Sequence, residues 1–420
     1  MNGQLAIEVW ADWSVGRDAE LMGQLFATPS RGKEIFSFEY DEKWLKGESR
    51  TQLDPALGMY AGVQYPSAQQ INFGLFLDSS PDRFGRVLMR RREALVARQE
   101  EREERRLVES DYLLGVHDEH RMGALRYRTD GAFLDDNDEL ASPPWTSLRE
   151  LEQACLQLER DDAESMPNYE HWLRLLIAPG GSLGGARPKA SVLDEQGALW
   201  IAKFPRTRDD IDIGAWEYVV HELALRAGVD VPEAQAQRFG SNHQTFLTRR
   251  FDRRSQGERI HFASALTLLN RTDGDDAEDG ASYLELAVFL KRAGSHAKSD
   301  LEQLWRRIAF SICVSNTDDH LRNHGFLLGR EGWRLSPAYD LNPEPESEGL
   351  KLNISESDNA QDLSLLMDVA PQFHLTNQRA EQVLAEVLAP VRGWREIARE
   401  QQLTASSQNR MSRAFRVAMK

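Results

Sequence analysis

The sequence contains few cysteines and no long apolar segment. Its two cysteines, Cys155 and Cys313, lie far apart in apolar surroundings, which predicts buried thiols in a reducing compartment rather than a disulfide framework. No apolar run approaches the roughly 18 residues of a membrane-spanning helix. Residues 1–13 lack a basic stretch followed by a long apolar core, so we expect no secretory signal. Together these absences favour the cytoplasm.

Positive charge is also scarce. The chain has 51 Lys and Arg against 67 Asp and Glu, a net charge of -16. Broad, non-specific binding to nucleic acid depends on neutralising phosphates, so this balance argues against it. The arginine-rich residues 83–106 are interleaved with five glutamates, which predicts an exposed, salt-bridged helix rather than a DNA-binding arm. A local contact with DNA stays open.

What remains is the composition of a globular protein with several parts. The 420 residues are 41% hydrophobic, enough for two or three domains with cores of their own. Residues 5–10 and 35–40 are strand-like, with alternation clearest in the second segment. Residues 71–88 combine an apolar strand, a Ser-Pro turn and the start of a helix that is expected to run to about Leu107. The acidic, turn-rich residues 130–144 mark the main boundary.

The polar residues 316–320 carry the strongest chemical signal. They follow a predicted helix in which Ser299 and Glu302 have capping-box spacing and apolar residues recur at helical intervals. A short hairpin is predicted next, over residues 326–335, and Asp340 comes directly after it. From about residue 283 onward the chain is predominantly helical.

This order suits phosphoryl transfer, which needs a carboxylate to orient the attacking hydroxyl, and a carboxamide and a second carboxylate to hold magnesium. Asp318 and Asn323 have the D-x-x-x-x-N spacing of the protein-kinase catalytic loop, and Asp340 follows where a second acid is needed. Two other interpretations stay open. One is an Asx-rich turn with solvated acids. The other is a zinc site of Asp318, His320 and His324, disfavoured because they crowd one loop and no other His or Cys pair has ligand spacing.

A glycine-rich segment lies upstream, at residues 180–189. Its four glycines let backbone N–H groups approach an anion closely, and Lys189 adds positive charge. Two strands are predicted next, and Lys203 lies inside the second, where a lysine is costly unless it meets a negative group. A helix over residues 213–227 offers Glu217 and Glu222 as partners. A kinase has this layout, although a flexible surface loop and a snorkelling edge-strand lysine are alternatives.

Taken together, these segments resemble the HipA-type serine/threonine kinases, the toxins of bacterial toxin–antitoxin pairs. The residues that carry the resemblance are 36–45, 78–86, 182–189, 250–253, 317–323 and 339–340. The resemblance implies an α+β, two-part kinase-like fold, with a β-rich N-terminal α/β region that carries the glycine-rich loop and an all-helical C-terminal lobe. The expected parts are an N-terminal α/β domain at 1–140, an ATP-binding part at 145–255 and a helical kinase lobe with the catalytic loop at 256–420.

The resemblance also implies a role for each matching position. Asp318 would be the catalytic aspartate, Asn323 and Asp340 would hold Mg²⁺, and His320 would line the nucleotide site. Lys203 would pair with the phosphates of ATP. The other implied nucleotide-binding positions are Ser182, Gly184, Gly185, Ala186, Arg187, Lys189, Arg249 and Phe251. At the hinge the family can have glutamate where this chain has Arg249, so we expect backbone contacts with adenine there rather than a side-chain contact.

Ser182 matches the serine that this family autophosphorylates to switch the kinase off, because a dianionic phosphate cannot share a loop with the phosphates of ATP. The family further implies a translation component as substrate, typically an aminoacyl-tRNA synthetase, and a small, DNA-binding HipB-like antitoxin as partner. DNA would then be contacted only through the antitoxin. Two alternatives are a catalytically weak co-repressor that acts with the antitoxin and a small-molecule kinase.

Overall fold

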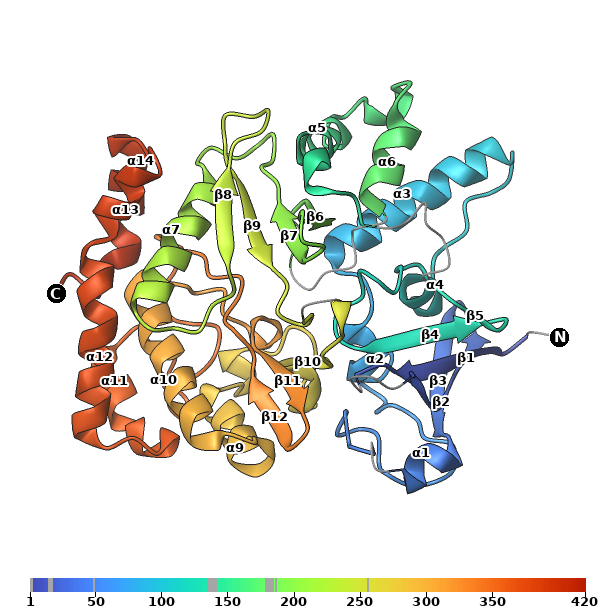
Figure 1. Ribbon diagram of the computed structural model, residues 1–420, viewed down its shortest axis with the longest axis horizontal. Helices are drawn as coiled ribbons and strands as arrows, with labels where there is room; N and C mark the ends of the chain where they lie inside the picture. Colours follow the sequence, from blue (N-terminus) through green and yellow to red (C-terminus); the bar gives the residue numbers. More distant parts are fainter. Residues whose placement is uncertain are drawn as a thin grey trace. The chain divides into compact units, whose positions relative to one another are not determined.

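The chain forms two compact units (Figure 1). Unit 1 comprises Met1–Thr207 and Asp252–Ala263, and unit 2 comprises Arg208–Phe251 and Ser264–Lys420. The predicted division into three parts stays a prediction. The computed structural model describes residues 3–13, 18–47, 50–134, 142–177, 185, 187–254 and 257–420.

Unit 1 is built on a five-stranded antiparallel sheet of order β3-β2-β1-β4-β5. In β1, Ile7, Val9 and Ala11 are buried while the residues between them are less so, which is the pattern of a strand with one face on a core. The two strands predicted from alternation are both confirmed. The strands are β1 (Leu5–Ala11), β2 (Glu20–Ser30), β3 (Lys33–Tyr40), β4 (Leu125–Thr129) and β5 (Ala132–Phe133).

Helices make up much of the rest of unit 1, and two of them correct the predictions. Residues 74–78 form a helix rather than a strand, because Phe73 and Phe76 pack against each other one helical turn apart. The charged helix ends at Gln99 rather than near Leu107. The helices are α1 (Glu42–Lys46), α2 (Gly74–Asp78), α3 (Arg83–Gln99), α4 (Glu109–Leu114), η2 (Trp145–Ser147), α5 (Leu148–Leu158), η3 (Ala163–Ser165) and α6 (Tyr169–Ile177).

The early end of α3 has an electrostatic reason. Arg102 turns back and lies 2.6 Å from the carboxylates of both Glu93 and Glu100. The salt bridges predicted for this run are therefore present, but they hold an irregular segment against the helix end instead of extending the helix. Unit 1 is completed by the predicted hairpin of β6 (Lys189–Leu193) and β7 (Leu199–Lys203).

Unit 2 is mainly helical. It contains the predicted helix α7 (Ile213–Arg226) and the hairpin of β8 (Ala234–Gln237) and β9 (Thr245–Arg249), and β10 (Phe262–Ser264) lies where the chain re-enters it. The unit also contains the predicted hairpin, β11 (Gly325–Gly329) with β12 (Gly332–Leu335), which is followed by residues 336–362 without a helix. Its other elements are α8 (Ala265–Leu268), η5 (Ala277–Asp279), α9 (Tyr283–Ala293), α10 (Ala297–Val314), η6 (Leu321–Asn323), α11 (Leu363–Asp368), η7 (Ala370–Phe373), α12 (Asn377–Arg392), α13 (Trp394–Glu400), α14 (Ala405–Met411) and η8 (Ser412–Phe415).

The helix α10 forms the centre of unit 2. It packs against α9 and α12, and its apolar residues Leu301 to Cys313 are buried as predicted. The predicted capping box is wrong, because the helix begins at Ala297 and the Ser299 hydroxyl donates to the carbonyl of His296. No described helix is long and apolar enough to cross a membrane.

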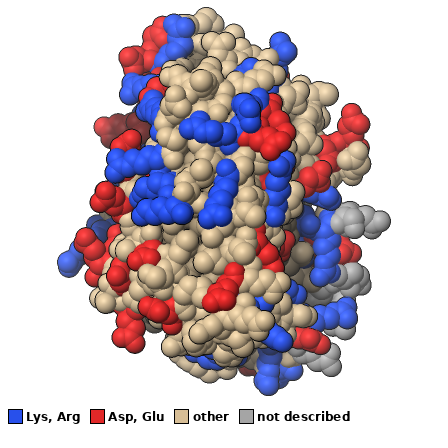
Figure 2. All heavy atoms as spheres, turned by 90° about the vertical axis from the view of Figure 1, so that its left-hand side faces the viewer, with Lys and Arg blue, Asp and Glu red and all other residues tan. Residues whose placement is uncertain are grey.

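The outer face of unit 2 carries positive charge. Figure 1 shows α12, α13 and α14 stacked along one side of unit 2, and Figure 2 shows Lys and Arg side chains gathered over the upper part of this face. The overall charge of -16 is therefore unevenly distributed. We call the exposed arginines of these helices and the turn that follows them the arginine face: Arg392, Arg395, Arg399, Arg410 and Arg413.

Candidate active site

The C-terminus of α10 directs the chain into the predicted catalytic loop. Ser315 ends the helix in the left-handed conformation (φ 51°), and the N–H of Asn316 bonds back to the carbonyl of Ser311. A left-handed residue at this position satisfies carbonyls that the helix leaves without a partner. The buried Ser315 hydroxyl donates to the Ala414 carbonyl at 2.8 Å, which fixes the turn.

Asp318 and Asn323 meet across the loop that follows. The Asn323 amide nitrogen donates to the backbone carbonyl of Asp318 at 2.9 Å, and the N–H of His320 donates to the same carbonyl at 3.0 Å. The Asp318 side chain is exposed, whereas Asn323 is buried. The spacing read from the sequence thus corresponds to a tight loop that presents one carboxylate to solvent and holds one carboxamide beneath it.

The neighbouring acid, Asp319, supports this loop from below. Its buried carboxylate accepts a hydrogen bond from the Tyr283 hydroxyl at 2.8 Å and lies 3.0 Å from His324. Burial alone would raise the pKa of Asp319, but the His324 ring and the Tyr283 hydroxyl hold this pKa below its ordinary value. Sequence reasoning missed this network, because nothing in two adjacent aspartates shows which one is buried.

A hydrogen-bond relay ties the second acid to the same loop. Asp340 follows β12 in the left-handed conformation (φ 58°), and its carboxylate accepts from the Asn342 side chain at 3.2 Å. The N–H of Asn342 in turn donates to the Asn316 side chain at 3.1 Å. The preceding residue, Tyr339, donates its hydroxyl to the Arg322 carbonyl at 2.7 Å. The segments of Asp318 and Asp340 are therefore held to each other by side chains that the sequence did not single out.

A third carboxylate, Glu344, lies close to Asp318. Its N–H donates to the Ser315 carbonyl at 2.9 Å. Partial burial raises the pKa of Glu344, and the negative charge of Asp318 raises it further. Negative charge therefore accumulates on this side of unit 2. Only the position of Glu344 four residues after Asp340 could have pointed to it in the sequence.

These residues fit a magnesium ion. The Oδ1 atom of Asn323 is buried and has no hydrogen-bond partner among the described residues. Leaving such an acceptor unsatisfied is costly, and a bound cation would satisfy it. Carboxylate and carboxamide oxygens are the donors that Mg²⁺ prefers. The zinc alternative has no such support, because Asp318, His320 and His324 do not form a three-ligand cluster in the described part of the chain.

The hinge residues lie in the same unit. Phe251 packs its ring 5.5 Å from that of Tyr339, directly beside Asp340 in the chain. Arg249 is exposed, its N–H donates to the Glu233 carbonyl at 2.8 Å, and its guanidinium lies 3.6 Å from the Glu233 carboxylate. The Arg249 side chain is thus turned toward an acid of its own unit, and its relation to adenine stays a prediction.

In unit 1 the two candidate phosphate-binding lysines lie on neighbouring strands. Lys189 and Lys203 are direct partners across the β6–β7 hairpin. Lys189 is buried, and its amino group lies 2.8 Å from the carboxylate of Asp82, which caps α3. Any contact of Lys189 with phosphate would have to coexist with this ion pair. Gly185 and Arg187 are described and are not buried, whereas Ser182, Gly184 and Ala186 lie outside the described residues.

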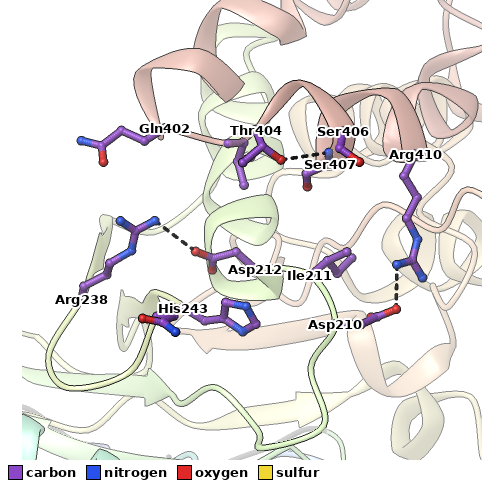
Figure 3. A pocket seen from close by; sticks show the side chains of 12 residues that line it. Asp210, Ile211, Asp212, Arg238, His243, Gln402, Thr404, Ser406, Ser407 and Arg410 are labelled. Carbon is purple, nitrogen blue, oxygen red and sulfur yellow. Dashed lines mark hydrogen bonds and ion pairs between the residues drawn. The ribbon is translucent and has the colours of Figure 1, made fainter.

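A separate pocket of about 320 Å³ opens in unit 2 (Figure 3). It is lined by residues 210–212 just before α7, by the turn between β8 and β9, and by α14 with the residues that precede it, and none of the predicted site residues belongs to it. Its charged groups are paired with each other, Arg238 with Asp212 at 3.7 Å and Arg410 with Asp210 at 2.6 Å. The pocket therefore gives no support to a second catalytic centre.

The fold and the site together place the chain in the class of kinase-like proteins. The model of the family "HipA-like C-terminal domain" matches residues 181–394, about half of the chain, and the chain belongs to this family. Its fold is that of a protein chain in a solved structure, which is the complex of HipA, HipB and operator DNA from the Shewanella oneidensis MR-1 toxin–antitoxin system. That match has a TM-score of 0.67 at 16% identity and covers 98% of this chain and 96% of the other.

Curated relatives match parts of the chain. "Putative kinase" of Haemophilus influenzae is 28% identical over 188 residues, which cover 40% of this chain and 54% of that protein. "Putative kinase Y4mE" of Sinorhizobium fredii is 29% identical over 149 residues, which cover 34% of this chain and 33% of that protein. The chain thus spans between a third and about half of the length of these relatives.

Proposed function

We propose that this chain is a Mg-ATP-dependent serine/threonine protein kinase of the HipA toxin type. One observation carries the proposal: Asp318, Asn323 and Asp340 belong to segments joined by a single hydrogen-bond relay, and Asn323 keeps a buried oxygen without a partner among the described residues. This arrangement suits catalysis by positioning and charge stabilisation, with little covalent chemistry for the protein to perform.

Each residue contributes a distinct step. Asp318 orients the acceptor hydroxyl and receives its proton as the oxygen attacks the terminal phosphorus, while the bond from that phosphorus to the bridging oxygen breaks and ADP leaves. Asn323 and Asp340 hold Mg²⁺, which when bound neutralises charge on the phosphates. Glu344 adds negative charge near Asp318 and so favours cations there. Lys203 and the glycine-rich segment bind phosphates, and the backbone around Arg249 and Phe251 binds adenine.

Regulation and partners follow from family membership. Ser182 is proposed as the autophosphorylation site, where a phosphate would repel those of ATP. The proposed substrate is an aminoacyl-tRNA synthetase, whose phosphorylation inhibits growth. A HipB-like antitoxin is the proposed partner, because the fold neighbour from Shewanella oneidensis is described in complex with HipB and operator DNA.

The decisive experiment incubates radiolabelled ATP with candidate synthetases and four proteins: wild type, Asp318→Ala, Ser182→Ala and Asp368→Ala. Asp368 is an exposed aspartate at the end of α11 and serves as the matched control. We expect labelling by wild type and by Asp368→Ala but not by Asp318→Ala. If Ser182→Ala no longer labels itself but still labels a synthetase, Ser182 is the autophosphorylation site. Wild type that labels neither itself nor a synthetase refutes the proposal.

A second candidate role is that of a co-repressor with the antitoxin, and the arginine face favours it. Arg395 stacks over the Trp394 ring at 4.4 Å, and Arg399 donates to the Arg395 carbonyl, so both guanidinium groups are held on the surface of α13. The test is binding of the complex to operator DNA at several salt concentrations. Arg395→Glu with Arg399→Glu should weaken binding and flatten its salt dependence if these residues contact phosphates. Unchanged binding excludes that role.

A further inference from the structure

A short loop of unit 1 gathers two histidines and a glutamate outside the candidate active site. The loop turns sharply, because the N–H groups of His120 and Arg121 both donate to the carbonyl of His117. Arg121 also holds the turn through its side chain, which donates to the Val116 carbonyl at 2.7 Å and forms a fully buried ion pair with Asp118 at 3.0 Å. The backbone of the loop is therefore fixed by bonds that do not involve the gathered side chains.

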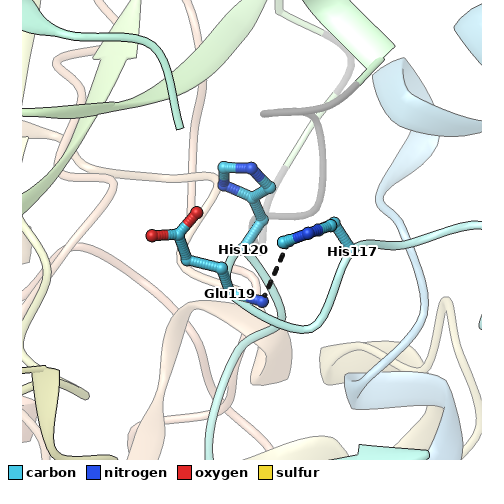
Figure 4. Close-up of side chains that lie close together, drawn as sticks. All are labelled: His117, Glu119 and His120. Atoms are coloured by element: carbon cyan, nitrogen blue, oxygen red, sulfur yellow. Dashed lines mark hydrogen bonds between the residues drawn. The ribbon is translucent and has the colours of Figure 1, made fainter. Parts of the chain in front are cut away.

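His117, Glu119 and His120 have the geometry of a metal-ligand set. One nitrogen or oxygen from each lies within 4.8 Å of the others. Figure 4 shows the three side chains leaving the same turn, with the His120 ring between the other two in that view. Tetrahedral ligands at 2.0–2.1 Å from zinc are about 3.4 Å apart, so small side-chain rotations would bring these atoms into place. Glu119 is only half-buried, which leaves it room to move.

An independent observation points to a ligand at this position. His117 is only 6% exposed, and its Nε2 atom has no hydrogen-bond partner among the described residues. A buried ring nitrogen without a partner destabilises the fold. The other ring nitrogen accepts only a long hydrogen bond, 3.3 Å from the N–H of Glu119. A neutral His117 that binds a metal through Nε2 carries its proton on Nδ1, which then no longer accepts from the N–H of Glu119. Metal binding therefore replaces this long hydrogen bond with a bond from Nε2 to the metal.

Ser142 orients the other two side chains. Its hydroxyl lies 3.1 Å from Nδ1 of His120, and its N–H donates to the Glu119 carboxylate at 2.9 Å. Bound histidines in metal sites commonly have their second ring nitrogen fixed in this way, which sets the tautomer and the direction of the ring. The backbone of the loop is held further by Arg253 and Arg259, which donate to the carbonyls of Glu119 and Asp118.

We propose that His117, Glu119 and His120 form a transition-metal site whose ion is Zn²⁺. Two imidazoles and one carboxylate match the donor preference of zinc, and a water molecule completes four-coordination. Magnesium is a poor match, since it prefers oxygen ligands in octahedral geometry. The site would clamp the loop that receives Arg253, and it requires no part of the kinase proposal.

The test is zinc binding by the 420-residue chain, which is stripped of metals with a chelator, incubated with Zn²⁺ and freed of unbound metal. Elemental analysis of wild type should give one Zn²⁺ per chain, and Co²⁺ at the same site should show the visible absorption of tetrahedral cobalt. Loss of a residue that only orients a ligand costs about 10- to 100-fold in affinity, so His117→Ala should weaken zinc binding at least tenfold. His171→Ala is the matched control, because His171 also touches a carboxylate, Glu150 at 3.0 Å, but is exposed.

Two further variants make the result unambiguous. Glu119→Gln changes a half-buried side chain and serves if His117→Ala does not fold; it too should weaken zinc binding at least tenfold. Asp340→Asn should keep full zinc binding, which separates this site from the candidate active site. The proposal is overturned if wild type retains no zinc, or if Glu119→Gln binds zinc as tightly as wild type and His171→Ala do.

Discussion

The hydrogen bond between Tyr283 and Asp319 should be one of the strongest single contributions to the stability of the catalytic loop. Tyr283 is completely buried, and its hydroxyl lies 2.8 Å from the Asp319 carboxylate. Phenylalanine fills nearly the same volume, so Tyr283→Phe removes the bond without opening a cavity. Because hydrogen bonds to charged groups contribute about 1.5–3 kcal/mol, we expect a loss of that size in the free energy of unfolding.

Tyr169→Phe provides the matched control. Tyr169 is 2% exposed, and its hydroxyl has no hydrogen-bond partner in the described part of the chain. Because a buried hydroxyl without a partner is destabilising by about 1–3 kcal/mol, its replacement should leave the free energy of unfolding unchanged or raise it by up to that amount. Urea unfolding followed by tryptophan fluorescence and circular dichroism measures both variants. Equal losses in the two would show that the bond between Tyr283 and Asp319 contributes nothing specific.

The same pair predicts a pH dependence. Tyr283 is one of the groups that hold the pKa of Asp319 below its ordinary value, so this contribution is present above the unfolded pKa of about 3.9. It is lost as the pH falls through the lower folded value. The deficit of Tyr283→Phe relative to wild type should therefore be full at neutral pH and shrink below about pH 4. A deficit that stays constant down to acid unfolding would contradict this assignment.

Three more predictions concern unit 1 and α7. Burial raises the pKa of Asp54 to about 6, so the free energy of unfolding of wild type should fall by up to about 3 kcal/mol as the pH rises from 4 to 6. Asp54→Asn should not show this fall, and urea unfolding at a series of pH values measures both proteins. Lys189→Met should destabilise unit 1 by about 3–5 kcal/mol because it leaves Asp82 buried and unpaired, and Lys189→Met with Asp82→Leu should recover most of that loss in thermal unfolding. Gly214→Ala should lower the free energy of unfolding by about 1–3 kcal/mol, because the added Cβ would overlap the Gln244 carbonyl; urea unfolding measures this loss.

Features that depend on neighbours in the chain could be predicted from the sequence. The strands at 5–10 and 35–40, the buried face of α10 and the β11–β12 hairpin all follow from periodicity and turn residues. The pairing of Asp318 with Asn323 is also local, since five positions separate them and a single tight loop joins them. The same reasoning gave a wrong prediction for residues 74–78, because a short apolar run does not distinguish a strand from a buried helix.

Features that depend on distant residues could not be predicted. Asp82 reaches Lys189 across 107 positions of the sequence, and Tyr283 reaches Asp319 across 36. Glu344 near Asp318 belongs to the same group. The expectation that no other His or Cys pair has the spacing of metal ligands was wrong, because His117 and His120 lie on one turn with Glu119. Their three-residue spacing was visible, but a sequence does not show whether a turn or an extended segment separates them.

The two lysines of the β6–β7 hairpin show how such a distant contact can decide a local role. Side chains directly opposite each other in an antiparallel pair are close neighbours, and like charges there are destabilising. The ion pair with Asp82 neutralises Lys189 within unit 1 and so relieves that repulsion. The structure thus gives Asp82 an electrostatic role that no local pattern around Lys189 could reveal.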